Sequence, residues 1–182
     1  MSAHLATGRV ILDDEQVGRT LRRIAHELVE KHADLDQLAL VGIYTRGALL
    51  AERLRDLIEQ FTGRSVPTGA LDISFYRDDV RVHPQPVVKA TRLDFPIDGR
   101  SVVLVDDVLF TGRTIRSAIE ALFGYGRPER VQLAVLVDRG HRELPIRPDY
   151  VGKNLPTARG ERVNVQLSEV DDVDRIVLLT AD

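Results

Sequence analysis

Two adjacent carboxylates, Asp106 and Asp107, directly follow a short apolar run at residues 102–105, which is typical of a strand buried in a parallel sheet. Shortly afterwards comes Thr-Gly-Arg-Thr at residues 111–114, and then apolar residues recur at helical spacing. A helix start presents unpaired backbone N–H groups and a positive dipole end, so a glycine and hydroxyls there favour a phosphate. Carboxylates are good acceptors for sugar hydroxyls. The order of these features predicts a site for a ribose 5-phosphate, with its hydroxyls on the acids and its phosphate on the loop.

Paired acids after an apolar strand also occur in receiver domains and in magnesium sites, and capping threonines are common. Residues 102–114, however, resemble the thirteen-residue phosphoribosyl pyrophosphate signature of type I phosphoribosyltransferases. The resemblance implies that Asp106 and Asp107 hold the ribose hydroxyls and act in catalysis. It also implies that the next residues bind the donor or nucleotide, the last five of them around the phosphate: Val108, Leu109, Phe110, Thr111, Gly112, Arg113 and Thr114.

The composition is that of a soluble globular protein, with 43% hydrophobic and 29% charged residues among 182, and the length predicts one domain over residues 1–182. Cysteine is absent, so disulfide and thiolate chemistry are excluded. No apolar run approaches the roughly 18 residues of a membrane span, and a signal-peptide core is missing. We expect a cytoplasmic protein. At a net charge of −3, nucleic-acid binding would need a local basic patch.

Apolar patterns predict an alternation of strands and helices. They predict strands at residues 38–43, 68–75, 131–137, 163–167 and 175–179, helices at about 15–31, 49–58 and 115–123, and an edge element or arm at 10–12. Asp13 or Asp14 can cap the first helix. This alternation predicts a right-handed α/β fold with a central parallel sheet flanked by helices, and ligands at the carboxyl ends of the strands.

A second loop with an arginine and a glycine follows the strand at residues 38–43. A guanidinium among backbone N–H groups suits a diphosphate. By itself this loop could be a plain strand–helix connection. Beside the paired acids, we predict that Thr45, Arg46 and Gly47 bind the diphosphate of the donor, with Arg46 counted among the catalytic residues.

Residues 76–98 contain three prolines and show no clear periodicity. Long loops inside a compact domain are usually lids or disordered segments. A lid suits a reaction whose activated sugar must be kept from water, and we predict one here; an inert surface loop is the alternative.

One face of the predicted helix at residues 15–31 is basic. Four residues lie nearly opposite its apolar stripe: Arg19, Arg22, Arg23 and His26. We expect that no acid lies on the same arc of the helix before Glu30. A solvated helix face is the plain interpretation. The same face also suits a polyanion.

Four longer segments, at residues 42–47, 72–79, 137–147 and 150–157, look like the pyrimidine operon attenuation regulator. That family is a bifunctional regulator and uracil phosphoribosyltransferase, and the resemblance covers nearly the whole chain. It implies a type I phosphoribosyltransferase fold with a small hood, formed by the N-terminal segment and about residues 138–170, and a flexible lid loop. It also implies that uracil and phosphoribosyl pyrophosphate give UMP and diphosphate, with Mg²⁺ held through the donor and not by direct protein ligands.

The resemblance further assigns roles to individual residues. Arg77 would close with the lid over the donor, while the base would meet, largely through backbone groups, Val137, Asp138, Arg139 and Val163. UMP or UTP would promote binding of a hairpin in the pyrimidine-operon leader mRNA. The residues that match the RNA surface or lie on the same helix face are Arg19, Arg22, Arg23, His26, His141, Arg142 and Lys153. The family also suggests a homodimer or higher assembly.

Two departures from the family pattern stand in this sequence: Phe110 replaces a frequent tyrosine, and Arg22 stands where an uncharged residue is common. Two alternatives to the bifunctional interpretation remain open. One is an RNA-binding attenuator with negligible turnover, and the other is a salvage enzyme without RNA binding.

Overall fold

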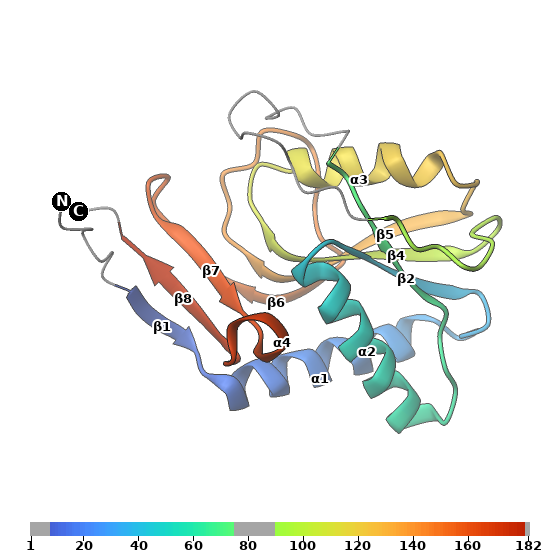
Figure 1. Cartoon of the computed structure of the whole chain (residues 1–182), viewed down its shortest axis with the longest axis horizontal. Helices are drawn as coiled ribbons and strands as arrows, with labels where there is room; N and C mark the ends of the chain where they lie inside the picture. The colour runs from blue at the N-terminus through green and yellow to red at the C-terminus, as the bar shows by residue number, and fades with distance from the viewer. Residues whose placement is uncertain (1–7, 75–89, 181–182) are drawn as a thin grey trace.

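A computed structural model describes residues 8–74 and 90–180. Within them, five strands form one parallel sheet in the order β3-β2-β4-β5-β6 (Figure 1). These strands are β2 (Leu38–Ile43), β3 (Thr68–Leu71), β4 (Ser101–Leu109), β5 (Arg130–Asp138) and β6 (Tyr150–Asn154). The predicted central parallel sheet is confirmed.

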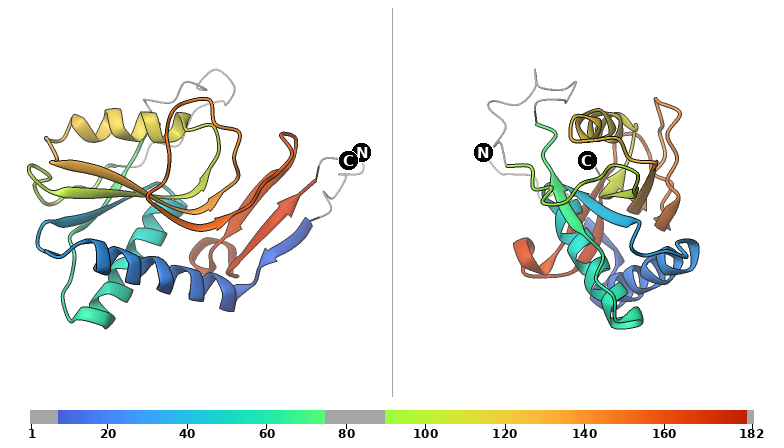
Figure 2. Two further views of the ribbon diagram at one scale, coloured as in Figure 1. Left: turned by 180° about the vertical axis from the view of Figure 1, so that it is seen from behind. Right: turned by 90° about the vertical axis from the view of Figure 1, so that its right-hand side faces the viewer.

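Helices cover both faces of this sheet. Helices α1 (Asp14–Lys31) and α2 (Arg46–Thr62) lie on one face, and α3 (Arg113–Phe123) lies on the other (Figures 1 and 2). A capping box starts α1: the Asp13 carboxylate accepts from the Gln16 N–H at 2.9 Å, and the Gln16 side chain accepts from the Asp13 N–H at 3.0 Å. Of the two acids expected to cap this helix, Asp13 does so.

The core has two layers because neighbouring strand residues point to opposite faces. Leu40 and Val103 pack with α1 and α2, whereas Val41 and Leu104 pack with α3, and all four are fully buried. Helices on both faces explain why β2 and β4 are apolar at successive positions rather than at alternate ones.

A second, smaller sheet is antiparallel, with the order β1-β8-β7. It contains β1 (Gly8–Leu12), β7 (Arg162–Gln166) and β8 (Arg175–Leu179), and the short helix α4 (Ser168–Asp171) lies between β7 and β8. We call it the small sheet. The expectation of parallel strand–helix alternation throughout was wrong here. The connection between β7 and β8 contains only the short α4, and parallel strands need a longer crossover, so the two strands pair antiparallel. Val165, Leu167 and Ile176 join the same apolar cluster as α1.

Among the bounds that differ from the predicted ones, those of β4 and β3 bear on the site. Strand β4 continues through both acids to Leu109, opposite Asp138 of β5, so the acids lie within the strand and not after it. Strand β3 ends at Leu71, and the Asp72 carboxylate then accepts from the Ser74 N–H at 2.9 Å in a local turn.

Most of the predicted lid, including Arg77, lies outside the described residues. Its last part includes Arg92, which forms an isolated antiparallel bridge with Ala70. Among the described helices, none is long and apolar enough to cross a bilayer.

Candidate active site

The two acids are held on β4 by hydrogen bonds from the adjacent backbone. Asp106 is 6% exposed and Asp107 is half-buried. The Asp107 N–H donates to Asp106 Oδ1, and the Val108 N–H donates to Asp107 Oδ1, each at 2.9 Å. These bonds offset part of the cost of placing carboxylates near the interior. A carboxylate has about four acceptor positions, so further hydroxyl donors can be accommodated.

The loop after β4 leads into a helix start whose geometry suits an anion. Gly112 is the N-cap of α3 and has a φ of 94°, a value that favours glycine. The Arg113 N–H donates to Thr111 Oγ1 at 3.3 Å, and the first turn of α3 carries no acidic residue. The helix start therefore presents backbone donors and a positive dipole end without a carboxylate from its own first turn.

The loop with Arg46 approaches β4 closely because two glycines have no side chain. A Cβ on Gly47 would lie 2.3 Å from the carbonyl oxygen of Val105 and 3.2 Å from the Cα of Asp106. A Cβ on Gly42 would lie 2.3 Å from the carbonyl oxygen of Gly47. The fold thus brings the predicted diphosphate loop against the strand that carries the acids. The peptide bond between Tyr44 and Thr45, within this loop, is cis.

Residues 139–146 fold back over the loop after β4. The N–H groups of Glu143 and Leu144 donate to the carbonyl oxygen of Thr111 at 2.9 and 3.2 Å. A Cβ on Gly112 would lie 3.4 Å from Ile146, so this segment packs closely on the start of α3. The segment after β5 therefore packs on the loop after β4 and helps to hold it in place.

The Arg142 side chain holds that segment together. Its guanidinium donates to the carbonyl oxygens of Ile146 and Phe110 at 2.9 and 2.8 Å, and to the Asp138 carboxylate at 2.6 Å. We predicted Arg142 as an RNA contact and Asp138 as a base contact. Both side chains bond within the protein, where Arg142 supplies donors to carbonyl groups outside the sheet. Their contacts with RNA and with a base stay predictions.

The Arg139 guanidinium packs against the ring of Phe110. It is 7% exposed, its guanidinium is 3.9 Å from the centre of the Phe110 ring, and it donates to Thr157 Oγ1 and to the Ala158 carbonyl at 3.1 and 3.2 Å. Burial lowers the pKa of the Arg139 guanidinium. His141 bonds to the Thr157 carbonyl through Nε2 at 2.6 Å. This packing joins the end of β5 to residues 157–158.

The other two predicted base contacts are apolar strand residues. Val137 is fully buried in the core, and Val163 is half-buried on β7, opposite Leu178 of β8. Neither side chain offers a polar group, in keeping with contacts that were expected largely through backbone groups. Recognition of a base through backbone groups at the end of β5 stays a prediction.

The predicted RNA residues on α1 also make internal contacts. Arg23 donates to the carbonyl oxygens of Val151 and Gly152, the latter at 2.6 Å, and pairs with Glu27 at 2.7 Å. Helix α1 thus docks on β6, the strand that carries the half-buried Lys153.

Two acids lie among these basic residues, so the expectation of none before Glu30 was wrong. Glu15 pairs with Arg19 at 3.7 Å and Glu27 pairs with Arg23, because side chains four residues apart share a helix face.

The remaining two residues of the basic face meet an aromatic ring of α2. The exposed His26 ring stacks on Phe61, with centroids 3.8 Å apart and planes 10° apart. The Arg22 guanidinium lies 5.9 Å from the Phe61 centroid. These two side chains form the more outward part of the predicted RNA surface.

Helix α4 and the turn after it contribute acids that sequence reasoning missed. Asp171 accepts from Arg46 at 2.9 and 3.0 Å, while Arg53 pairs with Glu169 at 2.5 Å and with Asp174 at 2.7 Å. Hydrogen bonds from Arg53 lower the pKa of both of its partners. A signal was present: Arg46 and Arg53 are two helical turns apart and share a face, and the chain is acidic at residues 169–174.

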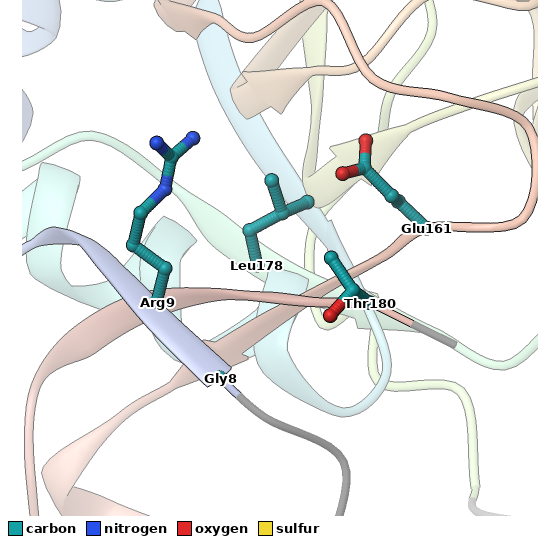
Figure 3. Close-up of a pocket in the computed structure, with 5 residues that line it drawn as sticks. All are labelled: Gly8, Arg9, Glu161, Leu178 and Thr180. Atoms are coloured by element: carbon teal, nitrogen blue, oxygen red, sulfur yellow. The ribbon is translucent and has the colours of Figure 1, made fainter. Parts of the chain in front are cut away.

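A separate cavity of about 370 Å³ lies at the outer end of the small sheet (Figure 3). Arg9 and Glu161 stand on either side of Leu178, with Gly8 and Thr180 completing the lining. None of these residues belongs to the predicted site.

Comparison with known proteins places this geometry in a class. Residues 9–169 match the family model of the phosphoribosyl transferase domain. Among solved structures, the hypoxanthine phosphoribosyltransferase of Trypanosoma cruzi has a TM-score of 0.72 at 19% identity, covering 96% of this chain and 97% of that chain. One from Staphylococcus aureus has a TM-score of 0.69 at 20% identity, covering 96% of this chain and 92% of that chain. At these identities the likeness shows the fold, which is that of a phosphoribosyltransferase.

Relatives of higher sequence identity show which family of phosphoribosyltransferases the chain belongs to. The chain is 57% identical over 172 residues to the bifunctional protein PyrR of Elusimicrobium minutum, covering 94% of this chain and 96% of that protein. It is 58% identical over 171 residues to the bifunctional protein PyrR of Streptomyces coelicolor, covering 93% and 89%. The chain belongs to the PyrR family of phosphoribosyltransferases.

Proposed function

We propose that this protein joins uracil to phosphoribosyl pyrophosphate, releasing diphosphate and forming UMP, and that it also binds a pyrimidine-operon leader hairpin when UMP or UTP is bound. The observation that carries the enzymatic part is the close approach of the Arg46 loop to the acids of β4, beside the start of α3. The bifunctional relatives at more than half identity support the regulatory part.

The residues of the site suit the charges of this reaction. As the bond between the ribose C1 and the diphosphate breaks and the bond to uracil N1 forms, positive charge develops on the sugar and negative charge on the diphosphate. Asp106 and Asp107 hold the ribose hydroxyls and favour the positive sugar, while Arg46 and the loop backbone favour the leaving diphosphate. The start of α3 holds the 5-phosphate, so the sugar is fixed at both ends and the reactants are oriented.

The donor chemistry also fits magnesium. Mg²⁺ keeps several waters and is usually bound through one or two carboxylates together with substrate phosphates. In the described part of the chain no group of three or more metal-binding side chains occurs, whereas β4 carries two adjacent carboxylates. When bound with the donor, the ion would neutralise diphosphate charge, and Asp106 and Asp107 are the residues that would lie near it.

The RNA surface, in this proposal, centres on the outward part of α1. Arg22 and His26 lie over Phe61, and Lys153 lies on β6 against which α1 docks. Folded RNA is recognised through its phosphates, its shape and its unstacked bases, for which cations and aromatic rings are suited. Arg23, His141 and Arg142 would support this surface mainly by fixing the elements beneath it.

Two measurements test the proposal. Pyrophosphate release should require uracil and should be absent with hypoxanthine or guanine. Filter binding to a leader hairpin should strengthen when UMP is added. Turnover without UMP-dependent binding would leave a salvage enzyme, and binding without turnover would leave an attenuator.

A further inference from the structure

The predicted diphosphate ligand Arg46 is already paired. Its Nη2 donates to both oxygens of Asp171, at 2.9 and 3.0 Å, and the Arg46 and Asp171 side chains are 33% and 19% exposed. The Nε of Arg46 is buried and has no hydrogen-bond partner within residues 8–74 and 90–180. A guanidinium recognises an oxyanion best through two parallel donors, so this pairing leaves one donor unused.

The Asp171 carboxylate is well suited to hold the Arg46 guanidinium and to release it. Burial opposes ionisation of Asp171, but the bond from the Leu167 N–H, at 2.9 Å, and the bond from Arg46 outweigh it, so the pKa of this carboxyl lies below its usual value. Because the Leu167 N–H stays bonded to Asp171, the carboxylate keeps a partner when Arg46 leaves.

Helix α4 does not depend on Arg46 for its position. Arg53, two turns along α2, pairs with Glu169 and Asp174 on either side of Asp171. In Figure 1 the short α4 lies beside α2. The contact between Arg46 and Asp171 can therefore open while the remaining ion pairs keep α4 on α2.

We propose that Asp171 is a positioning residue that occupies Arg46 until diphosphate replaces it. A carboxylate and a phosphate offer the same kind of acceptor oxygens, and they compete for one guanidinium. Diphosphate would replace the Asp171 carboxylate on Nη2, and the buried Nε could bind a second oxygen once the guanidinium turns as the pair opens. This inference rests on the proposed function of Arg46.

The competition between Asp171 and diphosphate affects two steps, the binding of the donor and the release of the product diphosphate. It weakens binding of the donor, because the pair between Arg46 and Asp171 must open first. It also favours departure of the product, because Asp171 recaptures Arg46 as diphosphate leaves. UMP has no diphosphate, so its affinity does not depend on this exchange.

The test uses Asp171→Asn, which keeps a side-chain oxygen for the Leu167 N–H and removes the negative charge that holds Arg46. The matched control is Glu169→Gln, which removes an ion pair of the same helix without touching Arg46. Isothermal titration with inorganic pyrophosphate, and inhibition of uracil turnover by pyrophosphate and by UMP, are measured for both variants and for Arg46→Ala. From the worth of a partly exposed ion pair we expect Asp171→Asn to bind pyrophosphate about three- to fivefold more tightly.

The KM for phosphoribosyl pyrophosphate should fall by the same factor in Asp171→Asn, with inhibition by UMP unchanged. Unchanged or weaker pyrophosphate binding in this variant, or equal tightening in Glu169→Gln, overturns the inference while leaving the uracil reaction intact. Retention of pyrophosphate binding in Arg46→Ala, or absence of uracil turnover in the unaltered protein, overturns the proposed function itself. The two failures are thus distinguishable.

Discussion

A single methyl group at Gly47 should disturb both stability and catalysis. In Gly47→Ala the new Cβ would lie 2.3 Å from the carbonyl oxygen of Val105 and 3.2 Å from the Cα of Asp106. A normal carbon–oxygen contact is about 1 Å longer, so the start of α2 must move away from β4 by roughly that distance. Overpacking of this kind costs about 1–3 kcal/mol of unfolding free energy. A displacement of ~1 Å in a positioning element can reduce turnover by about 10²-fold.

The assay is urea unfolding together with uracil turnover over a range of phosphoribosyl pyrophosphate concentrations. Gly160→Ala is the matched control, because a Cβ at Gly160 meets nothing within 4 Å. The control should leave both quantities nearly unchanged. If Gly47→Ala behaved like Gly160→Ala in stability and in turnover, the close approach of the Arg46 loop to β4 would not position the site.

The acids of β4, the buried His32 and the outward face of α1 each support a further prediction. Changing Asp106 and Asp107 together to Asn should abolish uracil turnover while circular dichroism stays that of the folded protein; retained turnover would refute the ribose-binding role. Burial lowers the pKa of His32 below 6.5, more than its bond to Gln132 raises it, so the unfolded chain binds the extra proton and stability should fall as pH drops below about 6.5. His32→Gln should flatten that slope in urea unfolding at pH 5 to 7. Arg22→Ala should weaken binding of the leader hairpin and leave turnover intact, and equal loss of both would point to misfolding instead.

Strand positions were predictable where burial on both faces imposes an unbroken apolar run. The prediction for β2 matches at both ends, and the one for β8 does so as well, because short apolar runs in the sequence end where the chain leaves the sheet. The end of β4 was not predictable in this way. Its pairing with β5 continues past the apolar run, so backbone hydrogen bonds carry the strand through Asp106 and Asp107.

Charged side chains were the least predictable part of the site. Arg142 and Arg23 are predicted RNA contacts, and nothing in the sequence indicates that each also donates to a carbonyl group distant in the chain, that of Phe110 or of Gly152. An arginine has five donors on a long flexible stem, so its partner depends on which acceptors the fold brings within reach. The pairing of Arg46 with Asp171, 125 residues apart, arises in the same way.

The sequence by itself determined which chemical groups stand together locally: two acids after an apolar run, a glycine and hydroxyls at a helix start, and an arginine and a glycine after a second buried strand. These are local patterns, and each follows from backbone conformation and the spacing of a few neighbouring residues. Only the tertiary structure decided that Gly47 lies against Val105, that residues 139–146 cover the loop after β4, and that Asp171 holds Arg46. Those contacts join segments far apart in the chain, and they form because the packing of the sheet and helices leaves particular donors and acceptors within a few ångströms of each other.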